Sequence, residues 1–240
     1  MVVDIAGKWA LVTGASRGVG RQIALGLAQK RVNLVLHSSS VSNQSDTRAL
    51  LSDCDVEVHG VEGQLDDPDA IAAFTEGAES VSGGIDILYN NAALMTPETP
   101  LFDTPQSDYE QSFQVNLLSV IQICAYFAPR MVARKFGRII NVSSGIKDTP
   151  QLDAYSLSKA ALDKYTRDLA VEVDGTGVLA NMLDPGWCRT DMGGPDAMND
   201  VETALPGALI PAMLGQTGPE APKGQLFRAQ DFVGMKWRRS

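Results

Sequence analysis

The chain has 240 residues, of which 44% are hydrophobic and 20% charged, and it carries a net charge of −9. This is the composition of an ordinary globular domain with one sizeable core. The excess of acidic residues argues against nucleic acid and anionic membranes as partners. The N-terminal residues lack a basic stretch followed by a long apolar run, so we expect neither a signal peptide nor a membrane span.

Cysteine and histidine usage indicates a cytoplasmic protein without a bound metal. The three cysteines, Cys54, Cys124 and Cys188, show no Cys-x-x-Cys spacing. A sparse, odd set of thiols fits a reducing compartment, where they behave as small apolar groups. Only His37 and His59 could supply imidazole ligands. The chain therefore has little material for a histidine metal site.

Short apolar runs alternate with longer helical periods along the chain. Apolar strands that alternate with helices predict a doubly wound α/β fold of Rossmann type, with a parallel sheet covered on both faces. No linker or repeat divides the chain, so we expect a single domain over residues 1–240. The predicted strands are Trp9–Thr13, Leu34–His37, Val56–Val61, Ile85–Asn90, Arg138–Val142, Val178–Leu183 and Gln225–Arg228, and the predicted helices are Val19–Lys30, Ser45–Ser52, Pro68–Val81, Ser107–Lys135 and Ala154–Val173.

Three local features qualify this outline. Pro129 lies inside the longest predicted helix and is expected to perturb its last turns. The acidic residues Asp66, Asp67 and Asp69 surround a helix start, where carboxylates cap free N–H groups more often than they bind a metal. The segment 184–224 is rich in glycine and proline, and we expect it to cover a ligand site rather than to form a second domain.

A glycine-rich turn joins the first strand to the first helix. Its sequence is Thr13-Gly14-Ala15-Ser16-Arg17-Gly18-Val19-Gly20, in which the glycines let backbone amides approach a pyrophosphate at the helix N-terminus. Within a strand–helix–strand unit, such a turn favours a dinucleotide site over an ordinary capping turn. The residues expected to contact the cofactor here are Gly14, Ser16, Arg17, Gly18, Val19 and Gly20.

The end of the second strand indicates which dinucleotide is bound. An NAD site usually places a carboxylate there to hold the ribose 2′-hydroxyl, whereas this strand ends in His37-Ser38-Ser39-Ser40. The hydroxyls of Ser38 and Ser39 can donate to a 2′-phosphate, and Arg17 supplies a cation nearby. The pattern favours NADP(H) over NAD(H). The alternative is that Arg17 is solvated and the serines only form a turn.

Tyr155 and Lys159 lie four residues apart in a predicted helix, so their side chains share one face. A free phenol ionises near pH 10, and a nearby ammonium stabilises the phenolate and lowers that pKa. Together the two groups can perform a proton transfer that neither does well alone. The same spacing is common on helix surfaces, so the rest of the chain must decide its meaning.

Six motifs follow one another along the chain. They are the glycine-rich turn, Asn90-Asn91-Ala92-Ala93, Val115-Asn116-Leu117, Asn141-Val142-Ser143-Ser144, Tyr155-Ser156-Leu157-Ser158-Lys159, and Pro185-Gly186 with Thr190-Asp191-Met192. In this order they give the chain a resemblance to the short-chain dehydrogenase/reductase family over nearly its whole length. The segments at Pro185 and at the chain end look most like the carbonyl-reductase branch. The resemblance implies hydride transfer between NADP(H) and a carbonyl or alcohol substrate.

The resemblance also implies individual roles. Tyr155 would protonate the substrate oxygen, while Lys159 would lower the pKa of Tyr155 and hold the nicotinamide ribose. Ser144 would polarise the carbonyl, and Asn116 would help to hold a water in a proton relay. The further cofactor contacts that the resemblance implies are Leu65, Asn91 and Ala92 on the adenosine side and Pro185, Gly186, Thr190 and Met192 at the nicotinamide end.

Two departures from the family pattern bear on the ligands. Gln64 stands where Asp or Asn often lies near the adenine, and the loop between Ser144 and Tyr155 is shorter than expected. Two other functions stay open, namely a 3-oxoacyl-carrier-protein reductase and a non-catalytic NADP(H)-binding sensor or regulator. An acidic carrier would need basic residues near the entrance, and Arg189 is the only one in 184–222. The substrate is expected to be a small molecule; monomer, homodimer and homotetramer all stay open.

Overall fold

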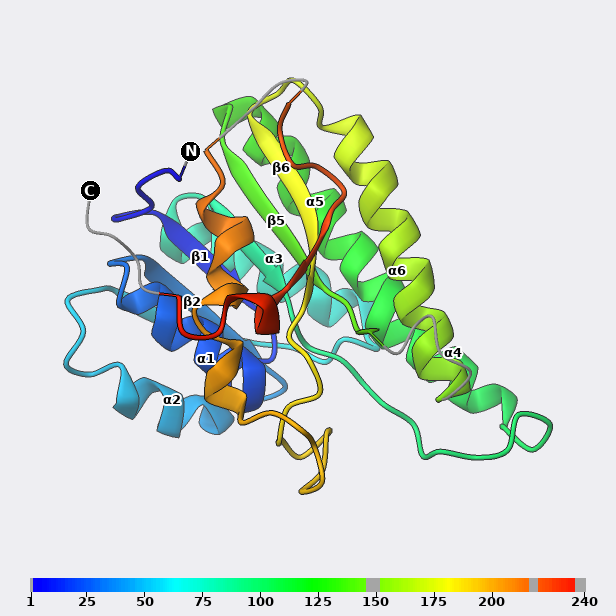
Figure 1. Ribbon diagram of the computed structural model, residues 1–240. Helices are drawn as coiled ribbons and strands as arrows, with labels where there is room; N and C mark the ends of the chain where they lie inside the picture. Colours follow the sequence, from blue (N-terminus) through cyan, green and yellow to red (C-terminus); the bar gives the residue numbers. More distant parts are fainter. Residues whose placement is uncertain (1, 146–151, 216–219, 236–240) are drawn as a thin grey trace.

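Seven parallel strands form one twisted sheet between two layers of helices (Figure 1). The computed structural model describes residues 2–145, 152–215 and 220–235. The strand order is β3-β2-β1-β4-β5-β6-β7, and every neighbouring pair is parallel. This confirms the predicted doubly wound Rossmann-type fold in a single domain. The strands are β1 (Trp9–Val12), β2 (Asn33–Ser38), β3 (Val58–Glu62), β4 (Ile87–Asn90), β5 (Gly137–Val142), β6 (Val178–Asp184) and β7 (Leu226–Arg228).

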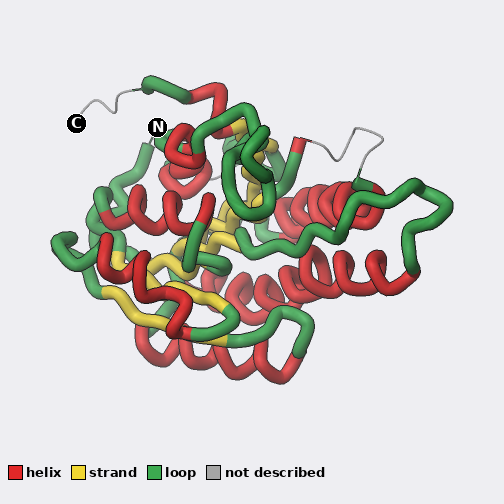
Figure 2. Tube along the Cα trace, turned by 90° about the horizontal axis from the view of Figure 1, so that it is seen from below, coloured by secondary structure: helices red, strands yellow, loops and turns green. Residues whose placement is uncertain are grey.

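The helices divide between the two faces of the sheet, and Figure 2 shows the strands as the layer between them. One buried cluster joins α1 and the 3-10 helix η5 to the sheet through Leu27 and Leu209. A second cluster joins α3, α5 and α6 to the opposite face through Phe74, Phe127 and Leu162. The helices are α1 (Gly18–Ala28), α2 (Ser45–Leu50), α3 (Pro68–Ser82), α4 (Gln106–Phe113), α5 (Ser119–Arg134) and α6 (Asp153–Glu172), with the 3-10 helices η1 (Val41–Gln44), η4 (Val201–Ala204), η5 (Gly207–Met213) and η6 (Ala229–Phe232).

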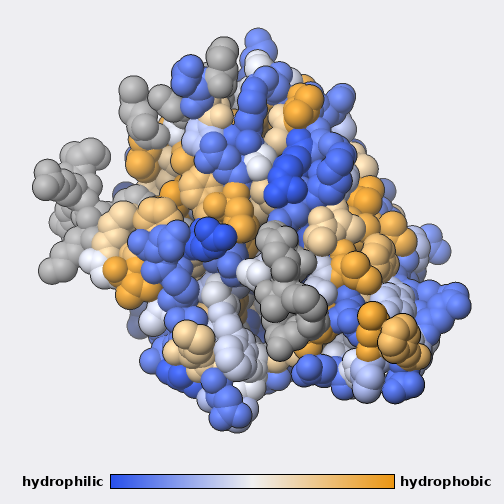
Figure 3. All heavy atoms as spheres, turned by 45° about the vertical axis from the view of Figure 1, so that its right-hand side comes forward, coloured by the Kyte–Doolittle hydropathy of each residue, from blue (hydrophilic) through white to orange (hydrophobic). Residues whose placement is uncertain are grey.

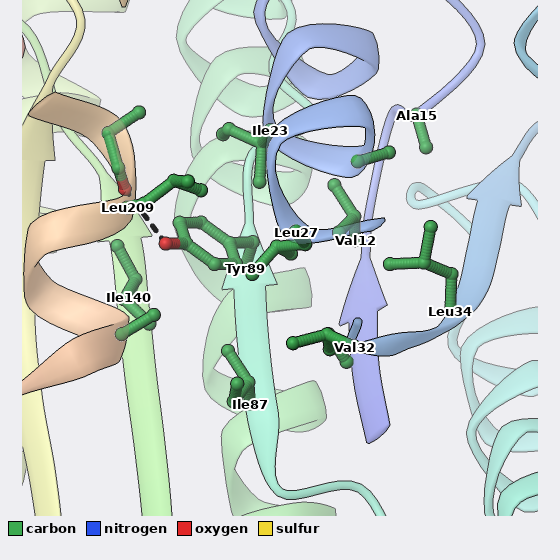
Figure 4. Close-up of a cluster of buried hydrophobic side chains, with 14 of the residues drawn as sticks. Val12, Ala15, Ile23, Leu27, Val32, Leu34, Ile87, Tyr89, Ile140 and Leu209 are labelled. Carbon is green, nitrogen blue, oxygen red and sulfur yellow. Dashed lines mark hydrogen bonds between the residues drawn. The ribbon is translucent and has the colours of Figure 1, made fainter. Parts of the chain in front are cut away.

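Tyr89 of β4 anchors η5 to the sheet. Its ring lies among Ile23, Leu27 and Leu209 in the close-up view (Figure 4). The hydroxyl donates a 2.8 Å hydrogen bond to the Ala208 carbonyl, and burial raises the pKa of this phenol well above its usual range. The segment that follows β6 is therefore fixed over one face of the sheet by a buried polar contact as well as by apolar packing.

The long helix predicted over Ser107–Lys135 is interrupted by a turn of π-helix, η2 (Gln114–Leu118), between α4 and α5. Pro129 does not end the helix, because α5 continues through it to Arg134, and the expected perturbation of the last turns stays a prediction. The irregularity lies at Asn116. The Asn116 side chain accepts a hydrogen bond from the Leu94 N–H (2.7 Å) and donates one to the Leu94 carbonyl (2.8 Å). The wider turn accompanies this pairing with a distant segment.

The acidic residues before α3 act as the sequence analysis expected. Asp67 is the N-cap of α3, and its carboxylate accepts hydrogen bonds from the backbone N–H groups of Asp69 and Ala70. Among the described residues, no group of three His, Cys, Asp or Glu side chains is arranged to hold a metal ion.

The helical stretch Gln106–Arg134 has the length and mean hydropathy of a membrane span, by composition alone. Core helices of globular domains meet the same criterion. Here 44% of its most apolar window is buried within the protein, and Val120, Ile123 and Phe127 belong to the second buried cluster. Packing against the sheet therefore accounts for part of its apolar surface.

We predict that Tyr89→Phe lowers the free energy of unfolding by about 1–3 kcal/mol, because the buried Ala208 carbonyl loses its donor while the ring is kept. Urea unfolding of the two proteins measures the difference. A change of less than about 0.3 kcal/mol would show that the Ala208 carbonyl finds another donor at no cost.

Candidate active site

A cleft of about 1230 Å³ opens at the carboxyl ends of the strands and is covered in part by residues that follow β6. It lies where the strand order reverses between β1 and β4, which is where parallel α/β sheets bind ligands. Gly20, Asn116, Ser144 and Gly186 lie next to it without lining it. The predicted site residues that line it are Gly14, Ser16, Arg17, Gly18, Val19, Ser38, Ser39, Leu65, Asn91, Ala92, Tyr155, Lys159, Pro185, Thr190 and Met192.

The glycine-rich turn is locked to the end of β4. Thr13 Oγ1 accepts hydrogen bonds from the backbone N–H groups of Asn91 (2.9 Å) and Ala92 (3.0 Å), while Asn91 Nδ2 donates to the Thr13 carbonyl (2.9 Å). Gly14 and Gly18 have φ values of +65° and +56°, a backbone region that favours glycine. A Cβ on Gly20 would collide with the Gly14 carbonyl and lie 2.5 Å from Asn91 Nδ2. The turn therefore tolerates no side chain at Gly20.

The end of the cleft next to β2 is polar. Ser38 is buried, and its hydroxyl donates to the Ser40 carbonyl (2.6 Å) and accepts from Gln44 Nε2 (3.0 Å). Ser39 is exposed and faces the cleft. The His37 ring pairs with the Gly63 carbonyl through Nε2 at 3.0 Å, and burial lowers the pKa of His37 to about 4, so it is neutral. Ser39 is thus better placed than Ser38 to meet a ligand.

Charged side chains at the cleft rim are already paired with each other. Arg17 and Asp191 are both exposed and form an ion pair of 3.1 Å that joins the glycine-rich turn to the segment after β6. Arg21 donates to the Ser16 carbonyl (2.6 Å) and lies 3.6 Å from Asp46. Exposed pairs of this kind contribute little stability. Arg17 can therefore exchange Asp191 for an anionic ligand at low cost.

Tyr155 and Lys159 project from α6 into the other end of the cleft. Lys159 is 2% exposed, and its Nζ donates a 2.8 Å hydrogen bond to the Val142 carbonyl at the end of β5. The ammonium lies 5.7 Å from the centroid of the Tyr155 ring. Burial lowers the pKa of Lys159 to about 8, and the charge of Asp163 opposes that effect. The helix thus brings a weakly held proton close to the phenol.

Tyr155 is 8% exposed and neutral near pH 7. The pKa of Tyr155 is raised to about 12, mainly by burial; a hydrogen bond with Ser144 acts to lower it, and the charge of Asp184 acts to raise it. The expected net lowering by Lys159 is absent here, because removal of the phenol from water outweighs the neighbouring groups. A neutral phenol is the form that can donate a proton to a substrate oxygen.

Asn116 and the covering segment are held mainly by their own polar contacts. Besides its two bonds to Leu94, Asn116 donates to Ser158 Oγ at 3.0 Å. The Gly186 N–H donates to Asp184 Oδ1 (2.9 Å), and the Trp187 indole donates to the Gly193 carbonyl (2.8 Å). The indole therefore packs its own segment in place.

Several residues near the chemistry were missed by sequence reasoning. Val142 and Ser143 line the cleft beside Lys159, and Asp163 and Asp184 act electrostatically on Lys159 and Tyr155. A single acidic residue in a helix or after a strand gives no pattern to detect. The loop between Ser144 and Tyr155, predicted to be short, falls largely outside the described residues.

The pattern of the short chain dehydrogenase family matches residues 8–200, and the chain belongs to that family. It is 35% identical over 198 residues to a short-chain type dehydrogenase/reductase of Picea abies, covering 78% of this chain and 73% of that protein. It is also 30% identical over 247 residues to the chloroplastic NADPH-dependent aldehyde reductase-like protein of Arabidopsis thaliana, covering 97% and 87%.

A solved structure with a similar fold is the 3-oxoacyl (acyl-carrier-protein) reductase of Agrobacterium tumefaciens C58 with NADP bound. The two chains share 27% identity with a TM-score of 0.82, and the match covers 93% of each. The family is thus shown to be that of an oxidoreductase, as the six motifs predicted, whereas the carbonyl-reductase branch stays a prediction.

We predict that Gly20→Ala abolishes NADPH binding, because the added methyl group collides with the Gly14 carbonyl and displaces Asn91. Fluorescence titration with NADPH measures the loss. Gly77→Ala on α3 is the matched control, since its Cβ would meet only Val61 Cγ1 at 3.7 Å, and it should bind NADPH normally. Equal affinity of Gly20→Ala and the unaltered protein would contradict the role of this turn.

Proposed function

We propose that the protein transfers a hydride between NADP(H) and a carbonyl or alcohol substrate, with Tyr155 as the general acid or base. The single observation that carries the proposal is that Tyr155 and Lys159 lie at one end of a cleft whose other end is a glycine-rich turn, with Ser144 beside the cleft and hydrogen-bonded to Tyr155. Proton donor and dinucleotide site are thus joined in one continuous space.

The residues fit a dinucleotide. Backbone N–H groups at the start of α1, glycines with positive φ, and the readily exchanged Arg17 make a cradle for phosphates. Such a cofactor supplies the hydride when it is bound. The clefts of dinucleotide enzymes also need a wall at the nicotinamide end, and we assign this to Pro185, Thr190 and Met192.

In the direction of reduction, Ser144 donates a hydrogen bond to the substrate oxygen and so stabilises the charge that develops there. Tyr155 then gives its proton to that oxygen. The resulting phenolate is favoured by the ammonium of Lys159, which is held in place by the Val142 carbonyl. In the direction of oxidation, the same phenolate removes the proton of the alcohol. Asn116 is the proposed support for a water in the proton relay.

NADP(H) is the preferred cofactor in this proposal. Ser39 and Arg17 are the donors at the adenosine end, and a 2′-phosphate would replace Asp191 as the partner of Arg17. The Arabidopsis thaliana relative is named as NADPH-dependent, and the Agrobacterium tumefaciens structure holds NADP. Both similarities support this choice over NAD(H).

A 3-oxoacyl-carrier-protein substrate is the second candidate, because the Agrobacterium tumefaciens neighbour is such a reductase. The charges near the entrance disfavour it. Arg189 is engaged with Asp200 and with the Ala197 carbonyl, while the exposed residues Asp191 and Glu202 carry the opposite charge. A large acidic carrier would be repelled by this surface, so a small neutral carbonyl compound is the better substrate.

The segment 184–224 is proposed to cover the substrate. The protein is also proposed to act in a reducing cytoplasm, because all three of its cysteines are free thiols in the structure. Exposed apolar side chains such as Phe102, Val171 and Met198 are dispersed along the chain, and Figure 3 shows apolar residues in several groups among polar ones.

Replacing Tyr155 with Phe is predicted to lower kcat for NADPH-dependent reduction by about 10³-fold, because the proton donor is lost while the ring is kept. NADPH affinity should change little. The assay is NADPH oxidation against a panel of aldehydes, ketones, quinones and β-keto esters. Unchanged turnover would rule out Tyr155 as the acid, and binding of NADPH without turnover of any substrate by the unaltered protein would favour a sensor.

The variant Ser39→Asp is predicted to shift the kcat/KM ratio toward NADH by at least about tenfold, because a carboxylate repels a 2′-phosphate and can hold a 2′-hydroxyl. Ser52→Asp adds the same charge to an exposed residue outside the cleft and should leave the ratio unchanged. Identical ratios in both variants would mean that Ser39 does not face the 2′ position.

A further inference from the structure

A buried carboxylate lies one helical turn beyond Lys159. Asp163 follows Lys159 by four residues on α6, so its side chain lies on the face that carries Tyr155 and Lys159. Asp163 is 1% exposed. Acidic side chains are almost never buried to this degree unless nearby groups compensate their charge. The proposed mechanism does not by itself explain why this position is acidic.

Asp163 and Lys159 are both hydrogen-bonded to residues at the carboxyl end of β5. The Ser143 hydroxyl donates a 2.5 Å hydrogen bond to Asp163 Oδ1. The preceding residue, Val142, accepts the 2.8 Å hydrogen bond from Lys159 Nζ. Two consecutive residues at the end of β5 therefore hold two oppositely charged groups of α6, and both contacts are removed from water.

The charges around Lys159 single out Asp163. It is the group whose charge favours the ammonium form of Lys159 against the effect of burial. Arg167 is half-exposed and lies 3.9 Å from Asp163 Oδ2, so it competes for the same carboxylate. Other titratable groups on the neighbouring elements include Asp153, Tyr155, Lys164, Tyr165, Asp168 and Glu172 on α6, Asp184 on β6, Cys124 and Tyr126 on α5, and Asp108, Tyr109 and Glu110 on α4.

We propose that Asp163 is a positioning residue. Held in place by Ser143, its carboxylate keeps Lys159 ionised and keeps the ammonium directed at the end of β5. The inference rests on the proposed function of Lys159. A buried lysine readily loses its proton, and a neutral amine would no longer favour the phenolate of Tyr155. A fixed negative charge behind the lysine prevents that loss and leaves the side of the ammonium toward the cleft free for ligand.

Removal of this charge should move two pH-dependent properties in a known direction. Activity should fall at alkaline pH when Lys159 loses its proton. Asp163→Asn should therefore move the alkaline limb of the kcat–pH profile to lower pH by about one unit, which corresponds to a tenfold lower proton affinity of Lys159. The pKa of Lys159 is about 8 in the folded protein, below its ordinary value of 10.5. Between these two pH values the unfolded chain binds more protons than the folded protein, so the free energy of unfolding rises with pH.

The same variant should make that rise in stability begin at a lower pH. This second readout does not require any substrate. The test measures kcat and Tm between pH 6 and 10 for the unaltered protein, for Asp163→Asn, and for Asp163→Glu, which keeps the charge. In Asp163→Glu the alkaline limb of kcat should lie close to its position in the unaltered protein.

Thr166→Val is the matched control. Thr166 Oγ1 accepts a 2.9 Å hydrogen bond from Asn141 Nδ2, so it is another buried contact between β5 and α6, but an uncharged one. Its loss should lower Tm at every pH without moving either pH-dependent midpoint. A shift in Thr166→Val equal to that in Asp163→Asn would overturn the proposal, because a purely structural role would then suffice.

The stability readout separates this inference from the proposed function. If no carbonyl compound is reduced, the proposed function fails, whereas a shifted curve of Tm against pH in Asp163→Asn still supports the coupling. The shift should vanish when Lys159→Met is also present, as a double-mutant cycle shows. A shift that persists in that background, or an unmoved curve in Asp163→Asn, overturns the proposal.

Ser143→Ala carries the test if Asp163→Asn does not fold. Without its donor, the Asp163 carboxylate can turn toward Arg167, and the alkaline limb and the rise in stability should move to lower pH by less than in the Asn variant. Midpoints that stay in place in Ser143→Ala would then overturn the role of the Ser143–Asp163 pair.

Discussion

The reversal of strand order between β1 and β4 is the constraint on which the site depends. Connections from β1 lead toward β3, and those from β4 lead toward β7, so no helix crosses the carboxyl ends of these two strands. Hydrogen bonds from Asn91 and Ala92 to Thr13 join the two strand ends. The glycine-rich turn therefore sits at the mouth of a crevice that the sheet itself creates.

Burial sets the chemistry at the other end of the same crevice. Removal from water would make Tyr155 a poorer acid and Lys159 a weaker base. Polar contacts from Ser144 and Val142, together with the charge of Asp163, work against these shifts. The proton-transferring groups thus depend on partners contributed by β5 and α6, whose register is fixed by the packing of the second buried cluster.

The period of apolar residues was sufficient to predict the strands and most helices, because burial on one face or both leaves a regular pattern. The glycine-rich turn and the Tyr155–Lys159 pair were predictable for a similar reason, since each requires particular residues at fixed local spacing. The π turn at Asn116 was not predictable, because it accompanies a contact with Leu94, 22 residues away in the chain.

The sequence alone determined the fold class, the family resemblance and most of the residues placed at the cleft, because these follow from local pattern and ordered motifs. Only the tertiary structure decided which of the two cleft-lining serines at the end of β2 is exposed, where the π turn interrupts the long helix, and which carboxylates act on Tyr155 and Lys159. Those properties arise from burial and from contacts between distant segments, as between Ser143 and Asp163. Desolvation and distant charge are properties of packed space, and a linear pattern does not contain them.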